Sequence, residues 1–386
     1  MRRILFVDDE QQILDGLRDR LRRKRRTWEM TFVASGREAL ERLEAGPCDV
    51  IVSDMRMPVM DGVALLTQVR ARHPEAIRIV LSGYAEQERL LQSVPVAHQF
   101  LTKPCSPEVL EKVIDRICDL RSLVAHAPIR RLVSGIEHLP SATATVRLLS
   151  AALEREDTTL GRVMRIVSRD PAVAVKILQA VNSGFVYSAR PIVSLEDAVC
   201  HLGLERIRRL AQATAMTEMP DAEPSHLEAL REHAVRVADR AATCFADILP
   251  PAEVHTAALL HDVGRIVLAA VMPEEEREIQ RLADRDGRQP HEVERELLGI
   301  THARIGGYLL GLWGLPAPLV DAAAHHHDPS HTAGTSPTLL TAVHVTDRIM
   351  RGREVDLDLE YLERIGCLGR LPAWRERIDQ MEPAAV

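Results

Sequence analysis

The sequence predicts two folds in one chain: a doubly wound α/β domain with a five-stranded parallel sheet up to about residue 121, then an all-α helical domain. The first observation is that short apolar runs alternate with amphipathic stretches in the N-terminal third, which is typical of strand–helix repeats. The second is that this alternation stops near residue 139 and helix-like segments follow. The third is length, because 386 residues exceed what one hydrophobic core usually serves.

Five apolar runs predict the strands, in the order ILFV, TFVA, VIVS, IVLS and QFLT. A helical segment is expected after each run, including helices over 11–25, 37–43 and 107–124. Five strands each followed by a helix predict a parallel sheet covered on both faces, with its chemistry at the carboxyl ends of the strands. The basic run RDRLRRKRR falls on the first helix and is interpreted as its solvated face.

The second part is predicted to be helical throughout, with helices over 159–168, 172–182, 227–246 and 252–268. Breakers such as Asp170-Pro171 and Pro250-Pro251 separate them. We therefore expect a first domain over 1–121, a helical linker over 122–138, a helical domain over 139–350 and a helical tail over 351–386.

Composition narrows the classes of function. A net charge of −7 with 3% aromatic residues argues against a nucleic-acid surface. No apolar run reaches the roughly 18 residues that span a bilayer, so we expect a cytoplasmic protein without membrane contact. The six cysteines are far apart and form no CxxC pair, which argues against a disulfide framework.

Ionisable side chains stand where the predicted strands end. Asp8 and Asp9 follow the first strand, Asp54 ends the third, Ser82 ends the fourth and Lys103 follows the fifth. Three carboxylates gathered at one sheet edge would repel one another unless a cation joined them, and their hard oxygen atoms suit Mg²⁺. The sequence therefore predicts a magnesium site with a lysine beside it.

These residues resemble the response-regulator receiver family, through VDDE at 7–10, SDMRMPVMDG at 53–62, LSGY at 81–84 and FLTKP at 100–104. The resemblance implies that Asp54 accepts a phosphoryl group from a sensor histidine kinase. It also implies that Asp9, Asp54 and the Arg56 backbone carbonyl bind Mg²⁺ and that Asp8 helps to hold the ion through water. Lys103 would neutralise the phosphoryl oxygens, while Ser82 and Phe100 would act as the switch that reads phosphorylation.

The helical part carries imidazoles and carboxylates at helix-scale separations that can converge on one or two metal ions such as Fe, Mn or Zn. Three consecutive histidines at 325–327 spread over about 200 degrees of a helix, so at most two can face one metal. The candidate ligands are His233, His261, Asp262, His302, His326, His327 and Asp347. The alternative is that His233 and His302 are hydrogen-bonded core residues and that the run 325–327 lies partly at the surface.

This part resembles the HDOD output domain, a relative of the HD fold, through DPAVAVKILQAVNSG at 170–184, LLHDVG at 259–264, ELLGITHARIGGYLLGLWGLP at 296–316 and HHDP at 326–329. The resemblance implies a regulatory or interaction module. The histidine and aspartate series is also similar to that of the phosphodiesterases of cyclic di-GMP, but the chain lacks their GYP motif after His327.

We therefore expect a two-component response regulator in which phosphorylation of Asp54 controls an HDOD module, with a homodimer as its assembly. The alternative function is a receiver-gated, metal-dependent phosphodiesterase or phosphohydrolase acting on cyclic di-GMP or another nucleotide.

Overall fold

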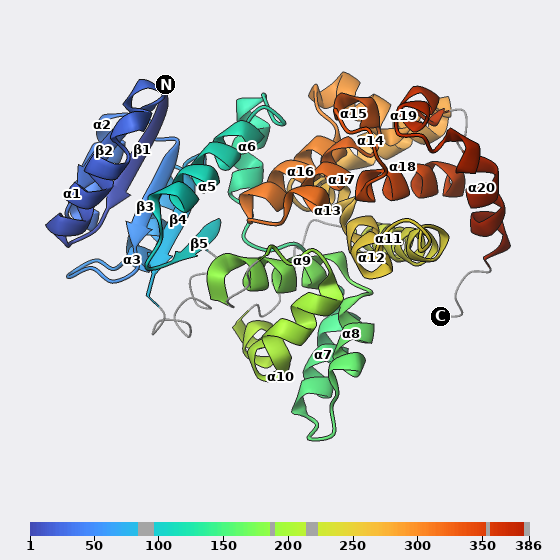
Figure 1. Ribbon diagram of the computed structural model, residues 1–386, viewed down its shortest axis with the longest axis horizontal. Helices are drawn as coiled ribbons and strands as arrows, with labels where there is room; N and C mark the ends of the chain where they lie inside the picture. Colours follow the sequence, from blue (N-terminus) through green and yellow to red (C-terminus); the bar gives the residue numbers. More distant parts are fainter. Residues whose placement is uncertain (84–95, 186–189, 214–222, 353–355, 382–386) are drawn as a thin grey trace. The chain divides into compact units, whose positions relative to one another are not determined.

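A computed structural model describes residues 1–83, 96–185, 190–213, 223–352 and 356–381. Within them the chain forms two compact units, which divide chiefly between Glu137 and His138. Figure 1 shows the strands within the blue and cyan N-terminal part and helices throughout the remainder. The predicted fold class is confirmed for both parts.

The first unit is built on a five-stranded parallel sheet of order β2-β1-β3-β4-β5. The strands are β1 Arg2–Val7, β2 Trp28–Val33, β3 Val50–Asp54, β4 Ile77–Ser82 and β5 Gln99–Thr102. Strands β3 and β4 lie at or next to the centre and are buried at every residue. Buried on both faces, they read as continuous apolar runs, as central strands of a covered parallel sheet do.

Helices cover both faces of this sheet. They are α1 Gln11–Arg20, α2 Gly36–Ala45, α3 Gly62–Arg72, α5 Pro107–Leu120 and α6 Ala127–Ser134. Leu43 of α2 and Leu65 of α3 pack with Ile51 on one face. On the other face, Phe6 stacks on Phe32, over whose ring the Arg18 guanidinium of α1 lies.

Two helices of the first unit end four or more residues before their predicted ends, and one predicted helix lies outside the described residues. Helix α1 ends at Arg20 rather than near 25, and the basic run continues as a 3-10 turn over Arg22–Arg26. That turn is not only a solvated face, because Arg23 and Lys24 pair with Glu111 and Asp115 of α5. Helix α5 ends at Leu120, four residues before the predicted end. The helix expected after β4 falls within 84–95.

The second unit consists of helices. They are α7 Thr143–Glu154, α8 Leu160–Val167, α9 Pro171–Ala180, α10 Leu195–Ala213, α11 Pro224–Cys244, α12 Pro251–Leu260, α13 Val263–Val271, α14 Pro273–Asp286, α15 Pro290–Leu298, α16 His302–Leu312, α17 Ala317–His325, α18 Leu339–Met350, α19 Leu359–Arg364 and α20 Leu371–Gln380. Seven of them begin with proline in the first turn, where the missing N–H costs nothing. Helices α11, α12, α17 and α18 pack together.

The predicted helix over 252–268 is two helices. The chain breaks at His261 and Asp262, so that α12 ends at Leu260 and α13 begins at Val263. Gly264 lets the start of α13 approach α16 closely, because a Cβ there would lie 1.9 Å from the His302 carbonyl oxygen. The break and the close approach bring the His261-Asp262 pair near the first residue of α16.

The segment Pro251–Val271 is long and apolar enough to cross a membrane, with a mean hydropathy of 1.4. However, 83% of its most apolar window is buried within the structure, as in the central helices of a packed domain. It is interrupted by the buried His261-Asp262 turn. We therefore interpret this segment as core.

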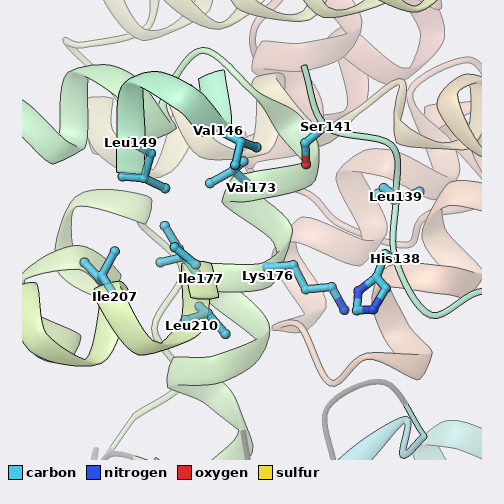
Figure 2. A pocket seen from close by; sticks show the side chains of 11 residues that line it. His138, Leu139, Ser141, Val146, Leu149, Val173, Lys176, Ile177, Ile207 and Leu210 are labelled. Carbon is cyan, nitrogen blue, oxygen red and sulfur yellow. The ribbon is translucent and has the colours of Figure 1, made fainter. Parts of the chain in front are cut away.

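An apolar pocket lies between α7, α9 and α10 (Figure 2). Leu149, Ile177 and Leu210 line it, and the Lys176 amine and the His138 ring point toward one another at one end. None of its lining residues belongs to the histidine and aspartate series, so this pocket contains none of the predicted site residues.

Candidate functional site

The first candidate site is the acidic pocket at the carboxyl edge of the sheet. Asp8 is 2% exposed and Asp54 is 7% exposed, whereas Asp9 is open to solvent. The Lys103 ammonium, carried past the end of β5, lies 2.8 Å from Asp8 Oδ2 and also pairs with Asp54 Oδ1. The register of parallel strands places these side chains together, as the sequence predicts.

The Asp54 carboxylate is oriented by two different groups. Its Oδ2 accepts a hydrogen bond of 2.7 Å from the Arg56 backbone N–H, and its Oδ1 faces Lys103. Burial raises the pKa of Asp54, and the Asp8 charge adds to this, while Lys103 opposes both without cancelling them. The carboxylate is thus short of positive charge, and a divalent cation beside it would supply that charge.

The pKa of Lys103 is shifted by the same interactions. Burial disfavours its charged form, but hydrogen bonds and charge from Asp54 and Asp8 outweigh burial and raise its pKa. The donor set for a metal at this edge consists of carboxylate oxygens with one exposed member, Asp9, on the solvent side. Such a set fits Mg²⁺, which keeps several of its waters.

The loop after Asp54 is held close to it by Gly62. A Cβ at Gly62 would lie 2.2 Å from the Asp54 carbonyl oxygen, and the Gly62 N–H donates to Met55 O at 2.9 Å. Only glycine fits this close approach. Val59 adopts a left-handed φ of 68° with an exposed side chain, which lets the loop turn.

The predicted switch residues are both buried. The Ser82 hydroxyl donates to Gly83 O at 3.3 Å, and the Ser82 carbonyl accepts from the Lys103 N–H at 2.7 Å. Phe100 packs in the apolar core on the α2 and α3 face of the sheet. Tyr84, the last residue of the LSGY motif, lies outside the described residues.

The second candidate site is a cluster in the helical unit, and it contains all seven predicted ligands. One group of ligand atoms within 4.8 Å of one another comes from Asp262, His302, His326 and His327, and another comes from His233, His261 and Asp347. His326 is 1% exposed and His327 is 8% exposed, so the alternative that placed them partly at the surface is wrong for these two. His325 belongs to neither group.

The first group has distances that suit one metal ion. Asp262 Oδ1 lies 3.1 Å from His302 Nε2 and 3.4 Å from His326 Nε2. His302 Nε2 lies 3.0 Å from His327 Nε2. Ligands at the usual Zn–N and Zn–O bond lengths would stand about 3.4 Å apart around a tetrahedral ion. The three measured distances between these ligand atoms are equal to this ideal spacing or slightly shorter than it.

Three of the imidazoles are held through Nδ1, so that Nε2 faces the other candidate ligands. The Nδ1 of His261 contacts Ala258 O at 2.6 Å, the Nδ1 of His326 contacts Ala323 O at 2.8 Å, and the Nδ1 of His302 contacts Glu294 Oε1 at 2.7 Å. Each of these oxygens accepts a hydrogen bond from the Nδ1–H. Among the described residues, His261 Nε2 and His326 Nε2 are buried without a hydrogen-bond partner. Metal-binding histidines show this arrangement.

His327 is held differently. Its Nδ1 is buried and has no hydrogen-bond partner among the described residues, and its ring stacks on His291 with centroids 3.9 Å apart. Stacking on His291 and the contact of its Nε2 with His302 Nε2 orient this ring.

The second group contains a cation of its own, the Arg351 guanidinium. It donates to Asp262 Oδ2 at 2.8 Å and to Asp347 Oδ1 at 2.7 Å, and it lies 2.9 Å from His233 Nε2. Burial alone would raise the pKa of both aspartates. The charges of His261 and Arg351 overcome this for Asp262. The charge of Arg351, with hydrogen bonds from His233 and His261, overcomes it for Asp347, and both pKa values fall well below the usual range.

The histidines of the first group differ in protonation. Burial lowers the pKa of His326 to about 4, so its imidazole is neutral. Burial also disfavours a charged His302, but Glu294 and Asp262 outweigh it and raise the His302 pKa to about 9. The buried carboxylate of Glu294 therefore contributes to the difference in pKa between His302 and His326.

Sequence reasoning missed Glu294 and Arg351. Glu294 stands at a core-facing position of the amphipathic helix α15. A glutamate at such a position, eight residues before the candidate ligand His302, could have indicated a carboxylate that contacts this ligand. Arg351 follows Asp347 by four residues, the spacing at which helical ion pairs form.

The fold and the acidic pocket define the first unit as a receiver of the response-regulator class, joined to an all-helical domain with a histidine and aspartate cluster. The family model of the response regulator receiver domain matches residues 4–115, and that of the HDOD domain matches residues 139–329. The chain therefore belongs to the response regulators that carry an N-terminal receiver and a C-terminal HDOD domain.

Individual proteins that match this chain share only part of its sequence or of its length. An uncharacterized protein of Treponema pallidum is 21% identical over 261 residues, which are 66% of this chain and 51% of that protein. The hydrogenase transcriptional regulatory protein HoxA of Cupriavidus necator is 37% identical over 31% of this chain and 25% of its own length. The chain thus spans about half or less of these relatives. A virulence factor from Campylobacter jejuni subsp. jejuni, 18% identical, covers 67% of this chain and 99% of its own with a TM-score of 0.52, which supports the fold alone.

Proposed function

We propose that Asp54 accepts a phosphoryl group from the phosphohistidine of a sensor kinase and that this controls the HDOD domain as a regulatory and interaction module. The observation that supports the proposal most is the pairing of buried Asp54 and Asp8 with Lys103 at the carboxyl edge of the sheet. Phosphoryl transfer to a carboxylate needs positioning and neutralisation of the equatorial oxygens. Lys103 would provide one positive charge there and Mg²⁺, held by Asp8, Asp9, Asp54 and the Arg56 carbonyl, would provide the other.

In this proposal Ser82 and Phe100 read the phosphorylated state. The Ser82 hydroxyl would exchange its bond to Gly83 O for one to a phosphoryl oxygen, and movement of that loop would allow Phe100 to repack. The protein would act in the cytoplasm as a homodimer, without contact to nucleic acid or membrane.

The test is to incubate the full chain with Mg²⁺ and acetyl phosphate and to measure intact mass. We expect one added phosphoryl group on the wild type and none on Asp54→Asn. An unlabelled wild type, or equal labelling of Asp54→Asn, would contradict the assignment of Asp54.

A second function, a receiver-gated metal-dependent phosphohydrolase, is favoured by the convergence of the seven ligands in the helical domain. Two features oppose it. All of the seven candidate ligands except His233 are almost fully buried, which leaves little room for a substrate, and Arg351 contacts both aspartates. We therefore place the regulatory module first. Hydrolysis of cyclic di-GMP by metal-loaded wild type, abolished in His261→Ala, would reverse this order.

A further inference from the structure

Arg351 makes the two halves of the helical cluster unequal. The carboxylate of Asp262 faces both halves: Oδ1 points to His302 and His326, and Oδ2 accepts the hydrogen bond from Arg351. A carboxylate in such a position can bridge two metal ions. Here one of its oxygens is already bound to a guanidinium.

The half around Arg351 is matched to that guanidinium. The Arg351 side chain is 19% exposed, and its Nε and Nη2 reach different carboxylates at 2.7 and 2.8 Å. Charge-assisted hydrogen bonds to two buried carboxylates are strong, and a second metal ion would have to break both and place a dication beside the displaced arginine. The contact of Nη2 with His233 Nε2, at 2.9 Å, further occupies that imidazole.

The other half keeps its ligands available. His326 Nε2 and Asp262 Oδ1 are buried without a hydrogen-bond partner among the described residues, and Glu294 orients His302 from behind. Three imidazoles and one carboxylate are a donor set for Zn²⁺, Fe²⁺ or Mn²⁺ rather than for Mg²⁺. Among the described residues, no arginine nitrogen contacts the Nε2 atoms of His302, His326 and His327.

We propose that Arg351 is the built-in cation of this centre, so that the helical domain holds one transition-metal ion, between Asp262, His302, His326 and His327, and not two. Such a centre is suited to holding α13, α16 and α17 together, or to sensing a metal, rather than to two-metal hydrolysis. Because all of these contacts lie within the helical domain, the number of bound ions can be measured without phosphorylating Asp54.

The experiment counts bound metal in the full chain. Chelator-treated protein is kept in excess Mg²⁺, which fills the receiver pocket, and is titrated with Co²⁺ while visible absorption and, after desalting, metal content are measured. We expect one Co²⁺ per chain for the wild type and for Arg351→Lys, which keeps the cation. We expect two for Arg351→Ala and Arg351→Gln, which remove it.

Matched variants connect the counts to the residues. His326→Ala should remove the ion of the wild type, and adding Asp347→Asn to Arg351→Ala should bring its count back to one. Arg281→Ala, which removes an exposed arginine of α14, should leave one ion. Circular dichroism shows which variants keep their helices. If Arg351→Ala does not fold, Arg351→Gln provides the count for a protein without the cation. Two ions or none in the wild type, or a single ion in folded Arg351→Gln, would overturn the proposal. Neither result would affect the labelling of Asp54.

Discussion

Gly62 controls how closely the loop that follows β3 can approach the backbone of Asp54. In Gly62→Ala the added Cβ would stand 2.2 Å from the Asp54 carbonyl oxygen, so the loop must shift. We expect a loss of about 1–3 kcal/mol in the free energy of unfolding, as for other overpacked sites, together with slower labelling by acetyl phosphate.

The matched control is Gly46→Ala, because nothing lies within 4 Å of a Cβ at that position. Urea denaturation and the initial rate of mass increase measure the two effects. If Gly62→Ala labels as fast as Gly46→Ala, the close approach of the loop has no part in the reaction.

Glu294 is the residue whose charge sets the state of His302. Glu294→Gln would keep a hydrogen-bonding side chain but remove the negative charge that holds His302 Nδ1–H. Partners of this kind are worth about 10- to 100-fold in metal affinity, so we expect a loss of that size in Co²⁺ affinity. Glu296→Gln, on the exposed side of the same helix, is the control and should bind as the wild type does. Equal affinities for the two variants would contradict the role of Glu294.

Part of this site was predictable and part was not, for a physical reason. Asp8, Asp54 and Lys103 follow strand ends, and parallel strands bring their carboxyl ends to one edge, so sequence order alone brings them together. The seven candidate ligands come from three helices, α11, α16 and α18, and from the turns after α12 and α17, and nothing in helical periodicity says which helix faces meet. Arg351 was missed because ion pairs at four-residue spacing are common on solvated helices, and its burial depends on tertiary packing.

At the scale of elements, β4, the approach to β5 and the end of α6 are joined by a buried polar network. His98 Nδ1 accepts from the Arg78 backbone N–H at 3.0 Å, and His98 Nε2 contacts Ser134 O at 2.9 Å. The Arg78 guanidinium donates to Val96 O at 2.6 Å and to Ser134 O at 3.1 Å. The network fixes the segment that leads into β5 and therefore the position of Phe100 and Lys103.

This network predicts a dependence of stability on pH. Burial, aided by the Arg78 charge, lowers the pKa of His98 well below 6.5, so His98 is neutral when folded but takes up a proton when unfolded. Its contribution is present in full above about pH 6.5 and is lost as pH falls below that value, by up to about 1.4 kcal/mol per pH unit. The advantage of the wild type over His98→Gln in free energy of unfolding should therefore shrink between pH 7.5 and pH 5.

Urea unfolding of the full chain, monitored by the hydrogen exchange of peptides from 1–121, would measure this difference in the free energy of unfolding. His126→Gln, which removes an exposed histidine, controls for general effects of the substitution. A difference between wild type and His98→Gln that stays constant with pH would show that His98 is not held neutral.

The receiver and the HDOD domain belong to separate compact units. If phosphorylation of Asp54 controls the HDOD domain as proposed, it must change an equilibrium that both domains share. Mg²⁺ with beryllofluoride, a stable analogue of the aspartyl phosphate, would bind the active conformation of the receiver and shift that equilibrium by its difference in affinity. Couplings between sites are typically 1–3 kcal/mol, which is roughly a 5- to 150-fold change in the affected exchange rates. We therefore expect altered hydrogen exchange in peptides from 139–350, and not only near Asp54, Ser82 and Lys103. Asp54→Asn treated in the same way should show neither change. Changes confined to 1–121 in the wild type would mean that the HDOD domain works independently of the receiver, and size-exclusion chromatography of the same samples would show whether the shared equilibrium includes dimer formation.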